Sequence, residues 1–386
     1  MMHLVTLALL TGPAHADEVA PGWHHTLVNE ATFDADNSTF VASAVRQWGP
    51  TNQVFVVTER RASTLDHTLL VDEYTCTDAP CSTSTHSTVA DEDLLGATSA
   101  DLMHLPGVAL RRHAPSGHME LHITHNTDGP FGCADSTDYI ETVWRTDVFG
   151  WGGSLDVWMS TAPGDCRKSG QSLTKYWKKK TWACFTQKTP SATEDRVRCG
   201  GVQNPSPWTT ALIDSPALGV QQDHPEFVFG PTAPAATRAV AYHQWEGASH
   251  EVRVRFIDDL GTPTQVYAAD VDHVSDRPSA DISLAEDRLG VVWEHRPAAG
   301  PTGWEIQYGD CTTLAGCLDP GGPGDTWSAS SVVHSGTRVR RPEFRSSGSA
   351  QFVVFLEETT DGEDDAILVT PQDRVHFTYR CSPADP

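Results

Sequence analysis

The stretch Gly290-Val291-Val292-Trp293-Glu294, followed by a second apolar run at residues 304–308, decides the fold. Short runs of β-branched and aromatic residues, separated by Gly, Pro, Asp and Asn, predict antiparallel strands joined by tight turns. The same hairpin recurs at residues 239–246 with 251–256 and at residues 352–357 with 366–370. No long helical periodicity accompanies it, so the sequence predicts an all-β protein built from repeats.

A proline marks the strand that precedes each of these hairpins. The three segments are His224-Pro225-Glu226-Phe227, Arg277-Pro278-Ser279-Ala280 and Arg341-Pro342-Glu343-Phe344. Proline lacks a backbone N–H, and at the first residue of a strand it removes no hydrogen bond that the sheet needs. We therefore expect each of these strands to begin at its X-Pro pair.

Fainter copies extend the repeat toward the N-terminus, at residues 53–58 with 67–74, 108–111 with 119–124, and 139–144 with 155–159. About six small antiparallel units of this length predict the blades of a β-propeller. We expect six blades of four-stranded antiparallel sheets, with five or seven as alternatives. They form a single domain over residues 17–386, with an irregular insertion around residues 160–210.

The first 16 residues have the pattern of a secretory signal peptide, with an apolar run from Leu4 to Leu10 followed by Ala14-His15-Ala16. This run is shorter than the roughly 20 residues that span a bilayer. The formal net charge of −24 disfavours nucleic acid and anionic membranes, because a polyanion repels both. We expect a secreted, periplasmic or cell-surface protein that has no membrane span and does not bind nucleic acid.

Nine cysteines also favour an oxidising compartment. The spacings Cys76-x4-Cys81 and Cys311-x5-Cys317 suit local disulfides in outer turns. Zinc is the alternative, but a thiolate site needs close pairs that meet in one place. Cysteines recur just after the outgoing strand of a repeat, at Cys76, Cys166, Cys311 and Cys381.

All six lysines fall between Lys168 and Lys188, interleaved with aromatic residues. Aromatic faces stack on sugar rings and ammonium groups bind anions, so this segment is a candidate site for an anionic glycan. The alternative is an edge strand that lysines protect from pairing with other chains. The candidate ligand-binding residues are Lys175, Tyr176, Trp177, Lys178, Lys179, Lys180 and Trp182.

Histidines cluster in residues 111–125. On a strand, His118, Glu120 and His122 share one face, a spacing that suits zinc or copper. Histidines on an exposed strand without a metal are the alternative. We expect neither a metal nor a cofactor, and we name His118 and His122 as the metal candidates.

Three glutamates end strands that look equivalent in the repeat: Glu246, Glu294 and Glu357. We expect them to cap solvated turns. The alternative is that they aim carboxylates at a common region or at calcium.

The segment Asp319-Pro320-Gly321-Gly322-Pro323-Gly324-Asp325-Thr326-Trp327 resembles the Asp box of the sialidase-like, BNR-repeat propeller superfamily. The likeness extends over residues 225–370. Cys317 stands where the family has serine, and two residues are inserted. The resemblance implies a propeller in which this segment is a structural turn.

The resemblance also implies candidate chemistry. Sialidases of this superfamily use an arginine triad, an aspartic acid and a tyrosine nucleophile paired with a glutamate. Arg277, Arg341 and Tyr379 invite comparison with that set, but the expected Arg-Ile-Pro motif is missing, as are serine-hydrolase, P-loop and dinucleotide signatures. We therefore expect a non-catalytic propeller that binds an extracellular glycan or protein through loops on one face. The alternative is a divergent exo-sialidase.

Overall fold

The structure is a computed structural model that describes the backbone of 25 strands and residues 195, 213, 217–220, 247–248, 303, 327–328 and 330. Side chains are described for residues 43–44, 53–56, 108, 184, 186, 195–199, 213, 217–228, 239–255, 278–281, 288–296, 303–311, 327–328, 330–336, 339, 341–346 and 351–355. Residues 1–17, which include the expected signal peptide, lie outside the described part of the chain. Among the described residues, no helix is long and apolar enough to cross a membrane.

The described strands form six antiparallel sheets. The first sheet contains β3 (Asn37–Trp48), β4 (Thr51–Ser63), β5 (Asp66–Cys76) and β6 (Ser84–Ala90). The second contains β7 (Leu102–Arg112), β8 (Met119–Asp128), β9 (Tyr139–Thr146) and β10 (Leu155–Asp156). The third contains β11 (Cys166–Trp177), β12 (Lys180–Lys188), β13 (Arg196–Gln203) and β14 (Ser206–Leu212).

The remaining three sheets follow in chain order. The fourth contains β15 (Gln221–Gly230), β16 (Thr237–Glu246), β17 (Ser249–Phe256) and β18 (Thr264–Ala268). The fifth contains β19 (Val274–Ser283), β20 (Arg288–Arg296), β21 (Trp304–Cys311), β22 (Ser331–Gly336) and β1 (Glu18–Val19). The sixth contains β23 (Val339–Ser347), β24 (Ala350–Glu357), β25 (Arg374–Cys381) and β2 (His24–Asn29).

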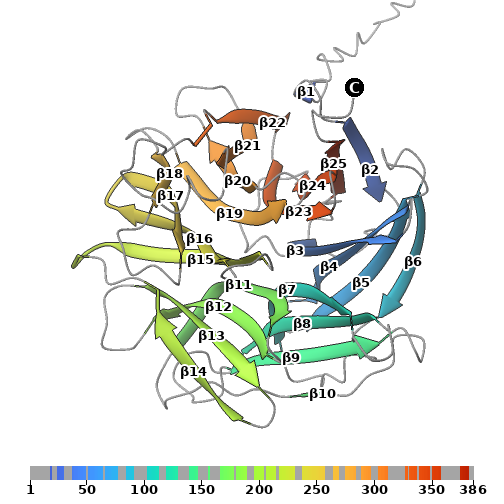
Figure 1. The fold of residues 1–386 in the computed structure, drawn as a ribbon, viewed down its shortest axis with the longest axis horizontal. Helices are drawn as coiled ribbons and strands as arrows, with labels where there is room; N and C mark the ends of the chain where they lie inside the picture. Colours follow the sequence, from blue (N-terminus) through green and yellow to red (C-terminus); the bar gives the residue numbers. More distant parts are fainter. Residues whose placement is uncertain are drawn as a thin grey trace, which may run out of the picture.

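The sheets are arranged around a common centre, and their innermost strands are β3, β7, β11, β15, β19 and β23 (Figure 1). Each innermost strand contacts the innermost strand of the next sheet, and β23 of the last sheet contacts β3 of the first. The N-terminal strand β2 pairs with β25, so both ends of the chain contribute to the sixth sheet. Residues far apart in the sequence therefore meet at the centre.

The clearest repeats are confirmed as hairpins, β16 with β17 and β20 with β21. Two other assignments were wrong. The third hairpin pairs β24 with β25 and not with residues 366–370, which lie outside the described residues. The upstream copies at residues 108–124 and 139–159 belong to one sheet, because β8 pairs with β9.

The segment expected to be an irregular insertion, residues 160–210, contains the regular sheet β11–β14. Its inner hairpin has register shifts between Lys168 and Ser172 and between Thr174 and Tyr176. The first shift inserts two extra residues into β11 and the second inserts one, so the period-two pattern that marks a strand is interrupted. The interrupted pattern explains why a sheet was not expected in this segment from the sequence.

The described hydrophobic core lies between neighbouring sheets. One cluster joins Val228 and Val254 of the fourth sheet to Leu289 and Trp293 of the fifth. A second cluster joins the fifth sheet to the sixth and contains Phe344. In the described part of the core, neighbouring sheets therefore bury apolar side chains against each other, which stabilises their packing.

Gly290 lies where β20 of the fifth sheet packs against Phe344 of the sixth sheet. A Cβ atom at this position would lie 2.6 Å from Phe344 Cε1 and 3.0 Å from Tyr308 Cε2. A glycine inside a strand often marks such a close approach. The absence of a side chain at Gly290 therefore leaves space for the Phe344 ring.

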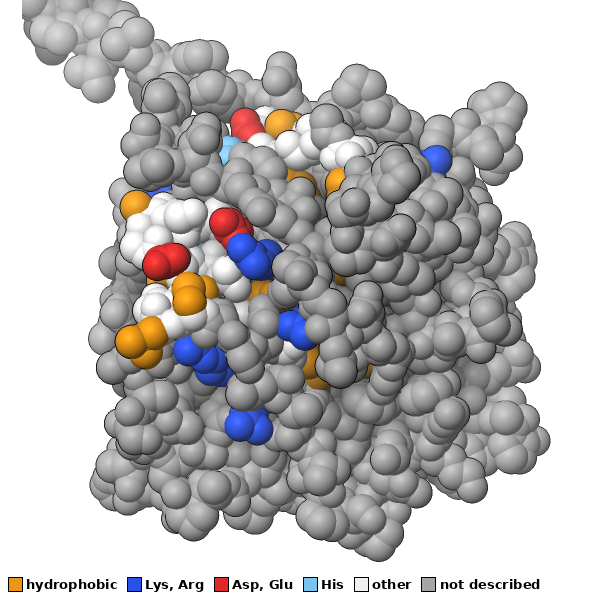
Figure 2. All heavy atoms as spheres, turned by 60° about the vertical axis from the view of Figure 1, so that its left-hand side comes forward, with side chains coloured by type: hydrophobic (Ala, Val, Ile, Leu, Met, Phe, Trp, Pro, Cys, Tyr) orange, Lys and Arg blue, Asp and Glu red, His pale blue; other side chains and the backbone are white. Residues whose placement is uncertain are grey.

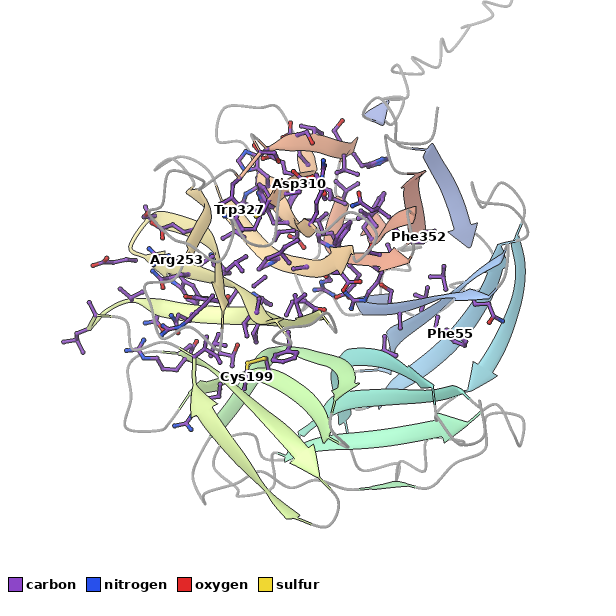
Figure 3. The ribbon with its side chains drawn as sticks, viewed as in Figure 1. Phe55, Cys199, Arg253, Asp310, Trp327 and Phe352 are labelled. Carbon is purple, nitrogen blue, oxygen red and sulfur yellow. A yellow bond between two sulfur atoms is a disulfide. The ribbon has the colours of Figure 1, made fainter. Side chains whose placement is uncertain are left out.

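The segment that resembles an Asp box ends against β21. Trp327 forms a β-bridge with Cys311, and Ser328 N donates to the carbonyl oxygen of Asp310 at 2.7 Å. Figure 3 labels Asp310 of β21 and Trp327, which lies beside the fifth sheet. The Asp310 carboxylate also accepts a hydrogen bond from Tyr308 Oη at 3.1 Å. These contacts fix the return of the chain to the sheet.

Candidate functional site

Three inner strands share a bulge near their start. The pairing register shifts between Asp223 and Glu226 in β15, between Asp276 and Ser279 in β19, and between Arg340 and Glu343 in β23. The X-Pro pairs lie in these bulges, so the expectation that they begin the strands was wrong. Proline is tolerated there because an innermost strand is the edge strand of its sheet and has one side without a ladder.

Polar side chains of the inner strands lie at the centre of the ring, where they form ion pairs with Arg345 of β23. Its guanidinium lies 3.0 Å from Glu226 Oε1 of β15 and 2.6 Å from Glu343 Oε2 of its own strand. Arg345 Nε donates to the carbonyl oxygen of Ser43 on β3. This side chain therefore ties together the fourth, sixth and first sheets. We call Arg345, Glu226, Glu343 and Asp281 the axial cluster.

Burial in the axial cluster affects the pKa values of Glu343 and Arg345. It raises the pKa of Glu343 to about 8, with a further contribution from Glu226, although Arg345 opposes the shift. Burial alone would lower the pKa of Arg345, but Glu226, Glu343 and Asp281 outweigh it and raise that pKa. At neutral pH the cluster therefore contains a charged guanidinium and a largely protonated Glu343.

Side chains of β19 accept hydrogen bonds from backbone N–H groups on the unpaired edge of β23. Phe344 N donates to Ser279 Oγ at 3.0 Å, and Ser346 N donates to Asp281 Oδ2 at 2.9 Å. The residue numbers rise together along both strands, from Phe344 with Ser279 to Ser346 with Asp281, so β19 and β23 run parallel. An unpaired strand edge is thereby closed without a backbone ladder.

A second polar group, Asp223 with His224, His243 and His250, lies at the β15 bulge. Asp223 Oδ1 lies 3.0 Å from His224 Nδ1 and 2.8 Å from His243 Nδ1. His243 Nε2 lies 2.9 Å from His250 Nδ1. Burial alone would raise the pKa of Asp223, but the two facing imidazoles outweigh it and lower that pKa. Asp223, His224 and His243 are the described residues that can hold a metal ion.

The expectation that Glu246, Glu294 and Glu357 occupy equivalent solvated turns was wrong for Glu294. Glu246 is exposed beside the turn at residues 247–248, whereas Glu294 is 1% exposed. Glu294 accepts a hydrogen bond from the backbone N–H of Arg341. Pairing makes Glu294 equivalent to His243, because each lies opposite the acidic residue that precedes a bulge. The side chain of Glu357 is outside the described residues.

The arginine and tyrosine candidates occupy different parts of the sheets. Arg341 lies in the β23 bulge, where it is 5% exposed and has a φ of 57°. Arg277 occupies the equivalent place in β19, and its side chain is outside the described residues. Tyr379 lies on β25 opposite Phe352, which pairs with Arg345 and not with Arg341. The register therefore separates Tyr379 from the bulge by a whole strand.

The lysine-rich segment forms the end of the β11–β12 hairpin, where Trp177 pairs with Lys180. Its side chains are outside the described residues, as are those of His122 on β8, Cys76, Cys81 and Cys317. His118 lies outside them entirely.

A disulfide joins Cys184 and Cys199, which face each other on β12 and β13 with Cα atoms 4.1 Å apart (Figure 3). This pairing was not predicted, because it depends on the register of the β12–β13 hairpin. Cys311 is also disulfide-bonded, and its pairing with Cys317 stays a prediction. Cys76, Cys311 and Cys381 end the third strands of their sheets, whereas Cys166 begins an inner strand.

Comparisons with known proteins identify the architecture. No protein-family model and no curated protein matches the chain. A solved Hadza microbial sialidase aligns with a TM-score of 0.54 and 11% identity over 90% of this chain, which spans 66% of that protein. A Dyadobacter fermentans protein of unknown function aligns with a TM-score of 0.57 and 9% identity over 94% of this chain and 100% of its own.

An α-L-arabinanase of Penicillium chrysogenum, solved with arabinobiose, aligns with a TM-score of 0.53 and 11% identity over 92% of this chain and 98% of its own. The chain has a β-propeller fold similar to that of these proteins. At these identities the likeness concerns the fold alone. It confirms the resemblance that the Asp-box-like segment suggested.

Sequence reasoning missed the residues that meet at the centre of this propeller. Glu226 and Glu343 both follow the proline of the repeat, a coincidence visible in the sequence. The third equivalent position holds Ser279. A recurrent acidic residue at a fixed place on an inner strand was the available signal. Nothing in the sequence indicated that Arg345 would join them.

Proposed function

We propose that this protein is an exported, six-bladed, non-catalytic propeller that binds a neutral carbohydrate at the axial cluster. The chain from residue 17 to residue 386 forms one domain. Its partner is an extracellular glycan, and it binds neither nucleic acid nor a cofactor at this site. The similarity to a sialidase and to an arabinobiose-bound arabinanase supports a carbohydrate ligand but does not specify one.

One observation carries the proposal: carboxyl groups and a guanidinium from separate sheets converge at the centre of a rigid ring. A few polar groups held in place by a scaffold are what a sugar-binding site needs, because they hydrogen-bond the hydroxyl groups in one orientation. Glu226, Arg345 and Glu343 side chains are 8%, 11% and 16% exposed, so Glu343 is the most accessible of the three.

Charge indicates the class of sugar. The axial cluster contains three carboxyl groups, on Glu226, Asp281 and Glu343, and one guanidinium. Even with Glu343 protonated, this centre does not offer the excess of positive charge that attracts sialic acid. A neutral sugar therefore fits better than an anionic one.

A glycan array followed by calorimetry tests the proposal. Glu226→Gln keeps the shape of the side chain and removes its charge, and we expect it to weaken binding about tenfold to a hundredfold, as for the loss of a charged hydrogen bond. The matched control is Glu251→Gln, because Glu251 pairs with Arg253 on the third strand of the same sheet, at 2.5 Å. We expect the control to bind normally.

Circular dichroism establishes that both variants are folded. Equal affinity of Glu226→Gln and the wild type would overturn the proposal, as would the absence of binding to any neutral glycan on the array.

Glycoside hydrolysis is the second candidate function, and the raised pKa of Glu343 favours it. A hydrolase needs one carboxyl group that stays protonated at neutral pH beside a second that is ionised. Glu343 meets the first requirement, and Glu226, ion-paired with Arg345, meets the second. Turnover of aryl arabinosides or sialosides that disappears in Glu343→Gln would establish hydrolysis. No turnover with retained binding would support the non-catalytic function.

The β11–β12 hairpin is a second proposed surface, suited to an anionic glycan. Trp177 pairs with Lys180, and Lys178 and Lys179 lie between them in the sequence. Replacing Lys178, Lys179 and Lys180 by alanine should abolish binding to sulfated glycans and leave neutral glycans unaffected. Aggregation of this variant without a change in binding would instead support edge protection.

A further inference from the structure

The Asp223 group departs from the ordinary geometry of a strand. Adjacent residues of a strand point to opposite faces of the sheet. Asp223 and His224 are adjacent, yet His224 Nδ1 lies 3.0 Å from Asp223 Oδ1. The bulge makes this possible, because His224 has a φ of 45° and its side chain turns back toward its neighbour.

The same backbone occurs elsewhere in the chain with different chemistry. Arg341 has a φ of 57° in the β23 bulge. There, however, the residue before it is Arg340, which pairs with Leu356. The bulge is therefore a property of the repeat, whereas the carboxylate and two imidazoles are specific to the fourth sheet.

Distances within the group match a coordination sphere. Asp223 Oδ1 lies 3.0 and 2.8 Å from the Nδ1 atoms of His224 and His243, and the three ligand atoms lie within 4.8 Å of one another. Ligands bound at about 2.1 Å from a tetrahedral metal ion are about 3.4 Å apart, so small side-chain movements would bring the three atoms to these separations. The atoms are thus already close to the separations that a single ion requires.

His250 and Trp245 support the ring of His243. His243 Nε2 lies 2.9 Å from His250 Nδ1, and the His243 ring stacks on Trp245 with centroids 4.9 Å apart. A metal-binding histidine commonly uses its other ring nitrogen in such a bond, which fixes the tautomer. With a metal on Nδ1, His243 donates from Nε2 to His250.

The Asp223 group is partly exposed, so a metal ion in solution can reach it. The side chains of Asp223 and His224 are 15% and 16% exposed, and that of His243 is 5% exposed. Three protein ligands on a partly exposed site leave further coordination positions for water or a ligand. Two imidazoles and one carboxylate suit zinc, cobalt or ferrous iron, whereas calcium and magnesium prefer oxygen ligands.

We propose that Asp223, His224 and His243 bind one divalent transition-metal ion, with Zn²⁺ as the principal candidate. The site lies on the strand that supplies Glu226 to the axial cluster. It does not depend on the carbohydrate proposal.

Calorimetry with ZnCl₂ tests the site on the full chain after dialysis against a chelator. We expect one Zn²⁺ to bind and to raise the melting temperature, because a ligand of the folded state stabilises it. CaCl₂ should have no effect. Co²⁺ provides a second measurement, since its visible absorption reports the coordination number.

Asp223→Asn and His224→Asn remove one ligand each, and asparagine tolerates the left-handed backbone of residue 224. We expect each to weaken Zn²⁺ binding at least a hundredfold. His250→Gln, which alters only the support of His243, should weaken it about tenfold. Glu226→Gln should retain Zn²⁺ binding, which separates this site from the carbohydrate site.

The proposal is overturned if the wild type shows no Zn²⁺ binding and no absorption from bound Co²⁺. It is also overturned if Asp223→Asn and His224→Asn are folded and bind Zn²⁺ as the wild type does, because the ion would then lie elsewhere.

Discussion

Replacing Arg345 by methionine tests whether the axial cluster holds the ring of sheets closed. The variant keeps an unbranched apolar stem but removes the guanidinium, which lies 3.0 Å from Glu226 and 2.6 Å from Glu343 and also binds the Ser43 carbonyl. Loss of one partner of a buried ion pair costs about 3–5 kcal/mol, because the remaining charge has no counter-ion. Glu343 is already largely protonated at pH 7, so Glu226 is the charged group that loses its partner, and we expect a loss of about 3 kcal/mol.

Urea unfolding followed by tryptophan fluorescence measures this loss. Arg253→Met is the matched control, because Arg253 pairs with Glu251 on the outer part of the fourth sheet, where both side chains are about one-fifth exposed. Figure 2 shows acidic and basic side chains interspersed on that side of the molecule. Such an exposed pair contributes about 0–1 kcal/mol. If Arg345→Met destabilises the protein no more than Arg253→Met does, the cluster does not close the ring.

Three further predictions concern the same part of the fold. Because the pKa of Glu343 is raised to about 8, the folded protein retains a proton that the unfolded chain releases near pH 4.5, so stability should fall by up to about 1.4 kcal/mol per pH unit between these values. Glu343→Gln should flatten that slope in urea titrations at several pH values, and an unchanged slope would contradict the assignment. Gly290→Ala should cost about 1–3 kcal/mol by overpacking against Phe344, while Gly303→Ala, whose nearest heavy atom is 3.9 Å away, should be close to neutral in the same assay. Replacing both cysteines of the Cys184–Cys199 disulfide by alanine should cost about 3 kcal/mol, as expected for a separation of 15 residues, and a normal unfolding midpoint would refute this.

The fold was predictable where each hairpin is short and regular. The residues Gly290-Val291-Val292-Trp293 are buried, as their apolar character predicts, and the partner strand β21 begins only eight residues after β20 ends. The same reasoning failed at residues 166–177, where two register shifts interrupt the alternation of side chains. It also failed after β24, because β25 begins only at Arg374. Periodicity identifies strands but not how far apart paired strands lie.

The candidate site was less predictable because its residues are far apart in the sequence. Arg345 and Ser43 are 302 residues apart and meet only because the last sheet lies beside the first. The Asp223 group depends on a bulge, and the sequence revealed its proline but not the backbone that turns His224 toward Asp223. Residue types alone could not locate either group, since closure of the ring creates one and a local irregularity creates the other.

A crystal structure with a bound neutral oligosaccharide would test the carbohydrate-binding account most directly. The account predicts sugar hydroxyl groups within hydrogen-bonding distance of Glu226 or Glu343, next to the Arg345 guanidinium. An oligosaccharide bound only at the β11–β12 hairpin or on the outer strands, with the axial cluster untouched, would contradict it.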